Sequence, residues 1–346
     1  MDITVFKDVF LLLLSLGALH YISEKYFIPS LDHLSKRLRL STDMAGSTLM
    51  AAGSSAPELA VALFAIFREG DHADLGIGTI VGSALFNILV ISGAVMLIRK
   101  STRLIWQPIF RDIIFYLLAI ILLAAVYMSG SFGLLSGLLL VGTYALYILV
   151  VYYWKRVFPY SDIEGHDEVA DIKHYRNFIF EGLNRLSMRI LRYYIPAFLF
   201  SIGMITLLSW LLVESAIGIS ASLGVPELLI GLTVVAIGTS VPDLIASVIV
   251  ARQGRPGMGI NNAVGSNVFD ILVGLGLPLL LYFIFIPGNI PANNENLYWS
   301  VGILFASALL LIGFFIAGQW RTSRIFGFFF ICLYALYFVY IVYTSV

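Results

Sequence analysis

Long apolar runs separated by short polar connections dominate the chain. Ten of these runs are long enough to cross the hydrocarbon core of a bilayer as an α-helix, which takes about 20 residues. They cover residues 5–21, 42–67, 76–98, 108–128, 132–154, 195–217, 226–250, 260–286, 298–317 and 325–345. The pattern predicts an all-α membrane protein with ten transmembrane helices.

One polar stretch, residues 155–194, interrupts this pattern. It predicts a cytoplasmic linker between a first five-helix repeat at residues 1–154 and a second at residues 195–346. Acidic residues come first in the linker and basic residues second, so we expect its later part to form an amphipathic helix on the membrane surface. The run at residues 5–21 is expected to be a retained span, because it has neither the basic region nor the cleavage site of a signal peptide.

Basic residues fall mostly in alternate connections between the spans. With the N-terminus placed outside, 19 of the 21 Lys and Arg residues lie on the cytoplasmic side, and Lys7 and Arg68 lie outside. Cytoplasmic connections of membrane proteins carry such an excess of Lys and Arg. The distribution therefore predicts that both termini are outside.

Composition supports a membrane protein. The chain is 60% hydrophobic and 12% charged, whereas soluble domains are about 45–50% apolar and about 25% charged. A net charge of zero excludes a basic surface for nucleic acid. The expected surroundings are the lipid bilayer, most simply the plasma membrane.

Two pairs of similar segments indicate an internal duplication. GSTLMAAGSSAPELAVA at residues 46–62 aligns with GLTVVAIGTSVPDLIAS at 231–247, with seven of 17 positions identical, and GSALFNILVISG at 82–93 aligns with GSNVFDILVGLG at 265–276, with seven of 12 identical. Repeats in the same order indicate an ancestral duplication. Equivalent spans are five apart, so the copies cross the membrane in opposite directions. This is the inverted-repeat architecture of secondary transporters, whose ions bind near the midplane.

Three acidic residues, Glu58, Asp243 and Asp270, fall well inside predicted spans. A carboxylate in a membrane span is costly and marks an ion pathway by default. Pro57 and Pro242 directly precede two of them. A proline removes a helix hydrogen bond and frees a carbonyl oxygen one turn earlier, so both are expected to break their helices.

The atoms gathered around these positions are all oxygens. Hydroxyl groups precede both prolines, in Gly53-Ser54-Ser55 and Gly238-Thr239-Ser240. Oxygen ligands suit calcium, sodium or potassium, and magnesium fits less well because it gives up water reluctantly. The single cysteine, Cys332, excludes a Cys-ligated metal site and a disulfide within the monomer, and no histidine has a metal-ligand partner at a useful spacing. We expect no catalytic residues and no cofactor.

These motifs resemble the alpha repeats of the cation/calcium exchanger superfamily. The resemblance lies in GSSAPE with GTIVGSALFN in the first repeat (about 46–93), and in GTSVPD with GSNVFD in the second (about 231–276). The sequence is most similar to the potassium-dependent sodium/calcium exchangers, through STDMAGSTLMAAGSSAPEL and SNVFDILVGLGLP. Asp270 stands where the potassium-independent animal exchangers carry asparagine. The short central linker departs from the much longer one of the animal exchangers.

The resemblance implies a role for each matching residue. Glu58 and Asp243 would be the central calcium ligands, with oxygens from Ser54 and Thr239, and Asp270 would be the third carboxylate that binds ions. The flanking sodium and potassium sites would be lined by Ser55, Ser83, Asn87, Ser240, Ser266 and Asp270, with the carbonyls of Ala51 and Ala236.

The expected function is therefore secondary active antiport of sodium against calcium, with potassium moving together with calcium. Three ionised carboxylates are matched by one calcium plus one potassium ion, or by three sodium ions. Two alternatives from the same superfamily remain open, a proton/calcium antiporter and a potassium-independent exchanger. An intramembrane aspartyl protease is disfavoured, because it expects a Gly-x-Gly-Asp context, and a receptor or structural protein gives no reason for charged, proline-containing repeats.

Overall fold

The computed structural model describes residues 3–38, 48–49, 51–70, 72–98, 101–160, 194–252, 254–292 and 294–345. Within this part of the chain, nine helical stretches are long and apolar enough to cross a membrane, so the protein is an all-helical, multi-pass membrane protein as predicted. Among the described residues, the only sheet is an antiparallel pair of two-residue strands, β1 (Ser131–Phe132) and β2 (Ile290–Pro291). The amphipathic helix expected in the linker lies outside the described residues.

The first half of the chain forms helices in the expected order. They are α1 (Ile3–Ile22), η1 (Ser23–Phe27), α2 (Ile28–Arg37), α4 (Ala51–Ser54), α5 (Ala56–Phe67), α6 (Ala73–Phe86), η3 (Asn87–Ile91), α7 (Ser92–Ile98), α8 (Trp106–Met128) and α9 (Leu134–Val157), where η marks a π-helical turn.

The second half contains a further series of helices and π-helical turns. Its elements are α11 (Tyr194–Leu223), α12 (Glu227–Ile230), η5 (Gly231–Val235), α13 (Ala236–Arg252), α14 (Pro256–Phe269), η6 (Asp270–Leu275), α15 (Gly276–Phe285), α16 (Glu295–Ala317) and α17 (Arg324–Ser345).

Two of the predicted spans differ from the structure. The span predicted at 42–67 is not among the nine, because its described part is divided into α4 and the short α5. The span predicted at 5–21 is longer, since α1 continues through η1 into α2 as far as Arg37. Ile22, Phe27 and Leu31 are buried beyond the predicted end, and packing of this segment against α11 explains the extension.

The π-helical turns recur at equivalent places in the two halves. η3 begins at Asn87 and η6 begins at Asp270, which are aligned positions of the sequence repeat. Residues 48 and 49 are also π-helical, and they align with residues 233 and 234 inside η5. Because π-helical turns occur frequently at functional sites, their recurrence marks both repeats as candidates for the functional site.

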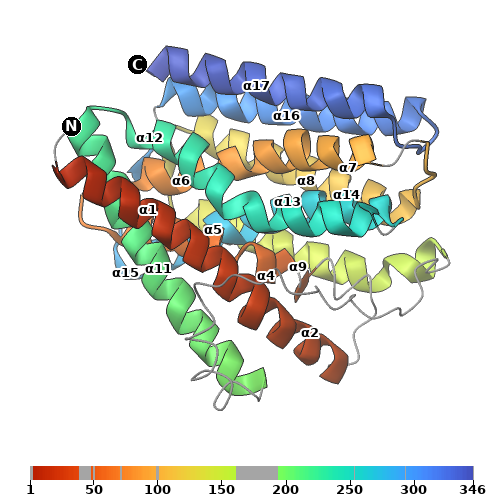
Figure 1. Ribbon diagram of the computed structural model, residues 1–346, viewed down its shortest axis with the longest axis horizontal. Helices are drawn as coiled ribbons and strands as arrows, with labels where there is room; N and C mark the ends of the chain where they lie inside the picture. The colour runs from red at the N-terminus through yellow and green to blue at the C-terminus, as the bar shows by residue number, and fades with distance from the viewer. Residues whose placement is uncertain are drawn as a thin grey trace.

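The helices form a central group between two flanking pairs (Figure 1). α16 and α17 lie along one side, and α1 and α11 cross the opposite side obliquely, packed on each other. The pair α1–α11 shares a small hydrophobic core of its own, which includes Leu12, Leu212 and Val61 of α5. Both ends of the chain lie at the same end of the molecule (Figure 1).

Close backbone contact joins the two halves at the centre. Gly82 of α6 lies against the carbonyl of Leu232, and Gly231 lies against the carbonyl of Leu75, so a β-carbon at either glycine would collide with backbone. Glycine at membrane helix interfaces permits such an approach. These contacts hold α6 directly against η5 and α13.

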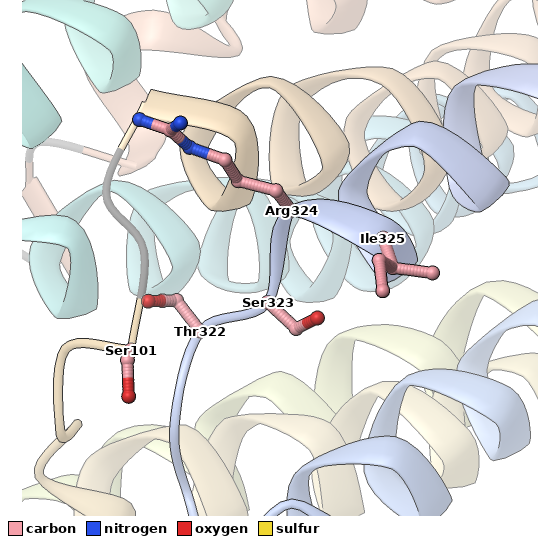
Figure 2. Close-up of a pocket in the computed structure, with 5 residues that line it drawn as sticks. All are labelled: Ser101, Thr322, Ser323, Arg324 and Ile325. Atoms are coloured by element: carbon pink, nitrogen blue, oxygen red, sulfur yellow. The ribbon is translucent and has the colours of Figure 1, made fainter.

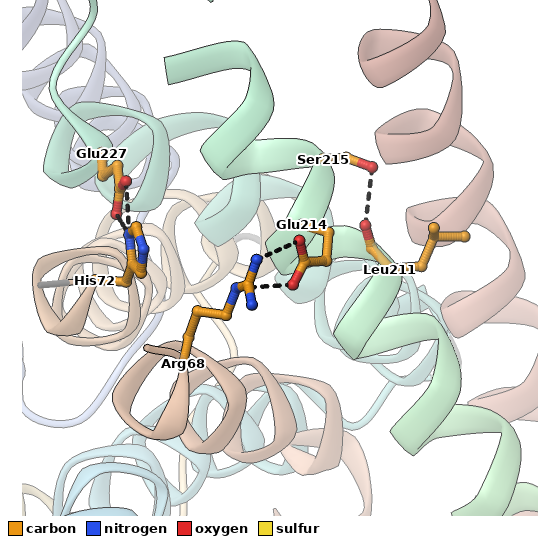
Figure 3. A network of polar contacts seen from close by, with 6 residues as sticks. All are labelled: Arg68, His72, Leu211, Glu214, Ser215 and Glu227. Carbon is orange, nitrogen blue, oxygen red and sulfur yellow. Dashed lines mark hydrogen bonds and ion pairs between the residues drawn. The ribbon is translucent and has the colours of Figure 1, made fainter. Parts of the chain in front are cut away.

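Ion pairs connect α5 to α11 and the start of α6 to α12 (Figure 3). The Arg68 guanidinium binds both carboxylate oxygens of Glu214, with Nε–Oε1 of 2.9 Å and Nη2–Oε2 of 3.0 Å, and thereby links the end of α5 to α11. His72 Nδ1 lies 2.8 Å from Glu227 Oε1. Since His72 directly precedes α6 and Glu227 begins α12, the connection between α5 and α6 lies beside the start of α12.

Candidate ion-binding site

The first site segment is a helix interrupted in front of a proline. α4 ends at Ser54, and α5 starts at Ala56 with Pro57 in its first turn. A proline is tolerated there because the missing N–H has no partner within the helix in any case. The predicted break at Pro57 is therefore observed, and it places Glu58 at the start of α5.

The predicted break at Pro242 is wrong. α13 runs from Ala236 to Arg252 without interruption and contains Pro242. Only the hydrogen bond to the carbonyl of Gly238 is lost, and neighbouring helices in a membrane protein can satisfy such a group. The irregular backbone of this span instead lies before α13, in the π-helical turn η5.

All three carboxylates predicted from the sequence are removed from solvent. The exposed fractions are 1% for Glu58, 2% for Asp243 and 0% for Asp270. They come from α5, α13 and the first residue of η6, so both repeats contribute.

Two serines join Glu58 to Asp270. Ser240 Oγ lies 3.5 Å from Glu58 Oε1 and 2.8 Å from Ser83 Oγ. Ser83 Oγ in turn donates to Asp270 Oδ2 at 3.4 Å. The row of oxygens alternates between repeats, since Glu58 and Ser83 belong to the first and Ser240 and Asp270 to the second. We call Glu58, Ser240, Ser83 and Asp270 the oxygen row.

Asp243 has a separate set of neighbours. Ser54 and Ser266 lie beside its carboxylate, and their hydroxyl oxygens are 3.3 Å apart. Asn262 Nδ2 approaches Asp243 Oδ1 at 3.5 Å. Here too the contact between Ser54 and Ser266 crosses from one repeat to the other.

The remaining predicted ligands have defined positions. Thr239 faces Glu58, while its hydroxyl donates to the carbonyls of Val235 at 3.0 Å and Ala236 at 3.3 Å. The carbonyl of Ala51 accepts from Ser55 N at 3.0 Å and from Ser54 Oγ at 3.3 Å. The two alanine carbonyls thus point to the hydroxyl side chains of their own helices.

Two asparagines near the carboxylates, Asn262 and Asn267, were not predicted from the sequence. Asn267 Oδ1 accepts from Asn87 Nδ2 at 2.9 Å, and Asn267 Nδ2 donates to the carbonyl of Ala84 at 3.0 Å. Ala84 is the position that aligns with Asn267 in the first repeat. A search for residues matched between repeats passes over both asparagines, because their partners are Ala84 and Thr79.

Several oxygens at the site could accept a further hydrogen bond or bind a cation. Within the described part of the chain, Ser55 Oγ, Glu58 Oε2, Asn87 Oδ1 and Asp270 Oδ1 are buried without a hydrogen-bond partner. Buried polar atoms normally have partners, so such oxygens require an explanation, and a cation is one. No group of three or more His, Cys, Asp or Glu side chains lies close enough to hold a metal by itself among the described residues. An ion here would depend on hydroxyl and amide oxygens as well as carboxylates.

A fourth buried carboxylate lies apart from the site. Asp112 and Arg111 in α8 are fully buried and paired, with Arg111 Nε 2.7 Å from Asp112 Oδ1. Tyr147 donates to the same oxygen at 2.9 Å. The pair is part of the helix packing between α8 and α9.

A pocket beside the start of α17 is also separate from the site (Figure 2). It has a volume of about 380 Å³ and is lined by Ser101, Thr322, Ser323, Arg324 and Ile325. None of the carboxylates borders it.

The sequence profile described as "Sodium/calcium exchanger protein" matches residues 8–153 and 193–343, and so covers both repeats and most of the chain. The chain belongs to the sodium/calcium exchanger protein family. This is a family of ion exchangers and not of enzymes. The resemblance seen in the alpha repeats is thereby confirmed.

Relatives within the family extend along nearly the whole chain. Sodium/potassium/calcium exchanger 5 of Homo sapiens is 30% identical over 90% of this chain and 77% of its own length. Sodium/potassium/calcium exchanger 2 of Gallus gallus is 26% identical over 94% of this chain and 75% of its own length.

Solved exchangers share the fold. The H+/Ca2+ exchanger CAX has a TM-score of 0.74 over 98% of this chain and 88% of its own, at 18% identity. The sodium-calcium exchanger NCX_Mj, soaked with Na+ and Sr2+, has a TM-score of 0.60 over 96% of this chain and 97% of its own, at 25% identity.

Proposed function

We propose that this protein is a secondary active antiporter that exchanges sodium for calcium, with potassium carried together with calcium. The oxygen row carries the proposal: Ser240 and Ser83 connect two buried carboxylates across the interface of the repeats. Carboxylate and hydroxyl oxygens are the ligands that calcium and the alkali ions prefer. The relatives named sodium/potassium/calcium exchangers support the same ions.

The exchange follows from competition for the same oxygens. Glu58, Asp243 and Asp270, all ionised, carry three negative charges. One calcium plus one potassium ion neutralises them, and so do three sodium ions. The two loads exclude each other, and each permits the site to be carried across the membrane, whereas the empty site retains uncompensated buried charge that opposes crossing.

Potassium is assigned to the end of the row at Asp270. Its Oδ2 accepts from Ser83, Ser55 lies beside the same carboxylate, and Oδ1 has no hydrogen-bond partner among the described residues. In the first repeat the same position is Asn87, which is neutral. The second repeat therefore provides the additional charge that a second cation requires.

The proposed architecture has ten spans in two inverted repeats, residues 1–154 and 195–346, joined by the linker at 155–194. The broken α4–α5 segment is the tenth span, in addition to the nine continuous ones. Both termini lie outside, in the plasma membrane, consistent with the placement of basic residues. The contact between His72 and Glu227 supports the inverted relation, because it brings the connection that follows α5 beside the start of the counterpart span at α12.

Calcium flux in proteoliposomes tests the proposal. Sodium, potassium and proton gradients are imposed separately on protein of wild-type sequence and on a Glu58→Gln, Asp243→Asn double variant. We expect uptake driven by an outward sodium gradient, raised by potassium on the calcium side, and absent in the double variant. Uptake that follows a pH gradient and ignores sodium would instead identify a proton/calcium antiporter.

A further inference from the structure

Two helix crossings beside the carboxylates are built alike. Gly76 of α6 packs on the backbone of Ala62 in α5, and Gly259 of α14 packs on the backbone of Ser247 in α13. Ala62 aligns with Ser247, and continuing the second alignment toward the N-terminus pairs Gly76 with Gly259. Each crossing lies one helical turn beyond a central carboxylate, Glu58 or Asp243. Because the connection between α5 and α6 lies beside the start of α12, the two crossings face opposite ends of the molecule.

The chemistry of the two crossings differs. At the α13–α14 crossing, Asn262 Nδ2 lies 3.2 Å from Ser247 Oγ and 3.5 Å from Asp243 Oδ1. At the α5–α6 crossing, Ala62 has no polar side-chain atom, and Thr79, which aligns with Asn262, donates to the carbonyl of Leu75 in its own helix at 2.8 Å. Ala62 and Thr79 are fully buried, whereas Asn262 is partly exposed.

The Asn262 amide lies between the Asp243 carboxylate and the Ser247 hydroxyl. Its N–H donor points to a carboxylate oxygen and a hydroxyl oxygen, the two groups that would bind a cation at this point. The nitrogen and oxygen ends of an amide have nearly the same shape, so a half-turn presents Oδ1 to an ion instead. Ser247 Oγ, Asn262 Oδ1 and an oxygen of Asp243 then form one small set of ligands.

We propose that Ser247 and Asn262 form an ion-binding station adjoining Asp243, through which calcium and sodium pass between the central site and the end of the molecule where α13 ends. Among the described residues, the crossing of α5 and α6 provides no equivalent set of oxygens. This inference rests on the proposed exchange function, because it assigns a further binding position on the path of the same ions.

Thiol labelling tests the station with a matched control. In a Cys332→Ser background, Ser247→Cys and Ala62→Cys place a thiol at equivalent positions, and a membrane-impermeant thiol reagent is applied from each face separately. We expect Ser247→Cys to react from the face of Arg252 only, and calcium at ten times its Kd to slow the reaction about tenfold, since about one site in ten is then free. Ala62→Cys should react far more slowly from both faces. Equal reactivity of the two thiols, or labelling unaffected by calcium, would overturn the station.

A second pair of variants keeps the test independent of the cysteine substitutions. Asn262→Ala should weaken the apparent calcium affinity of flux by roughly three- to tenfold, the loss of about one oxygen ligand, while Thr79→Ala changes it by less than about twofold. An equal effect of both substitutions would contradict the inference. Sodium-driven flux of the protein with neither change is measured alongside, and its absence would contradict the proposed function. If this flux is present but calcium does not slow the labelling of Ser247→Cys, only the station is contradicted.

Discussion

Ser83 Oγ and Ser240 Oγ lie 2.8 Å apart, and this contact joins the two repeats at the centre of the oxygen row. Both side chains are fully buried. Each also contacts one carboxylate, Ser240 with Glu58 and Ser83 with Asp270. The two hydroxyls therefore act as one unit, and their contributions to ion binding should not be independent.

We expect Ser83→Ala and Ser240→Ala each to raise the sodium concentration for half-maximal exchange by about two- to tenfold. The double variant should show less than the product of the two effects, because both changes remove the same contact. Sodium titration of calcium flux measures this. Ser215→Ala is the matched control, since Ser215 is buried and donates to Leu211 of its own helix at 2.8 Å (Figure 3). Strictly multiplicative effects would show that the two serines bind separate ions.

Glu58→Gln preserves the shape of the side chain and removes its charge. We expect apparent calcium affinity to fall by roughly ten- to 150-fold, the range for loss of one charged ligand. Stability should respond in the opposite direction. In EGTA the thermal unfolding midpoint should be equal or higher, because a buried charge without a cation is unfavourable. A variant that unfolds earlier in EGTA would show that Glu58 holds the helices together instead of binding ions.

Asp270→Asn removes the charge assigned to potassium and makes the position identical to Asn87 of the first repeat. Calcium flux should persist and become independent of potassium. The measurement is initial calcium uptake across a series of potassium concentrations at fixed sodium gradient. Potassium dependence that is unchanged in the variant would move the potassium site elsewhere.

The two arginine–carboxylate pairs should differ in their contribution to stability. Arg68 is 45% exposed, so Arg68→Met should lower the free energy of unfolding by less than about 1 kcal/mol. Arg111 is fully buried, and Arg111→Met leaves Asp112 charged in the interior, which should cost about 3–5 kcal/mol. Denaturant unfolding in detergent compares the two variants directly. Equal losses would mean that burial does not set the strength of these pairs.

Much of the fold follows from the apolar runs, and the residues of the site follow from the internal repeat. The carboxylates Glu58, Asp243 and Asp270 stand out because charge is rare in such runs, and the structure finds all three buried. The continuation of the first helix past residue 21 could not be predicted from the apolar runs, because polar residues follow residue 21. Phe27 and Leu31 lie among them and pack in the interior, in a segment that contacts α11, a helix far away in the sequence.

The contacts between the two repeats also could not be predicted from the sequence pattern. The alignment pairs Ser83 with Ser266, yet Ser83 contacts Ser240 and Ser266 contacts Ser54. These partners depend on how closely the glycines allow α6 and η5 to approach. The proline pattern predicted two broken helices, and the difference at Pro242 arises because surrounding helices support an unbroken α13.

The central claim is that one oxygen-lined site binds sodium and calcium in competition and carries them in opposite directions. Calcium uptake into proteoliposomes loaded with sodium tests it most directly, with the sodium gradient imposed, abolished and reversed at constant pH and potassium. Exchange predicts uptake with the outward sodium gradient, none without a gradient and calcium release on reversal. Calcium uptake that is the same under all three conditions would contradict it.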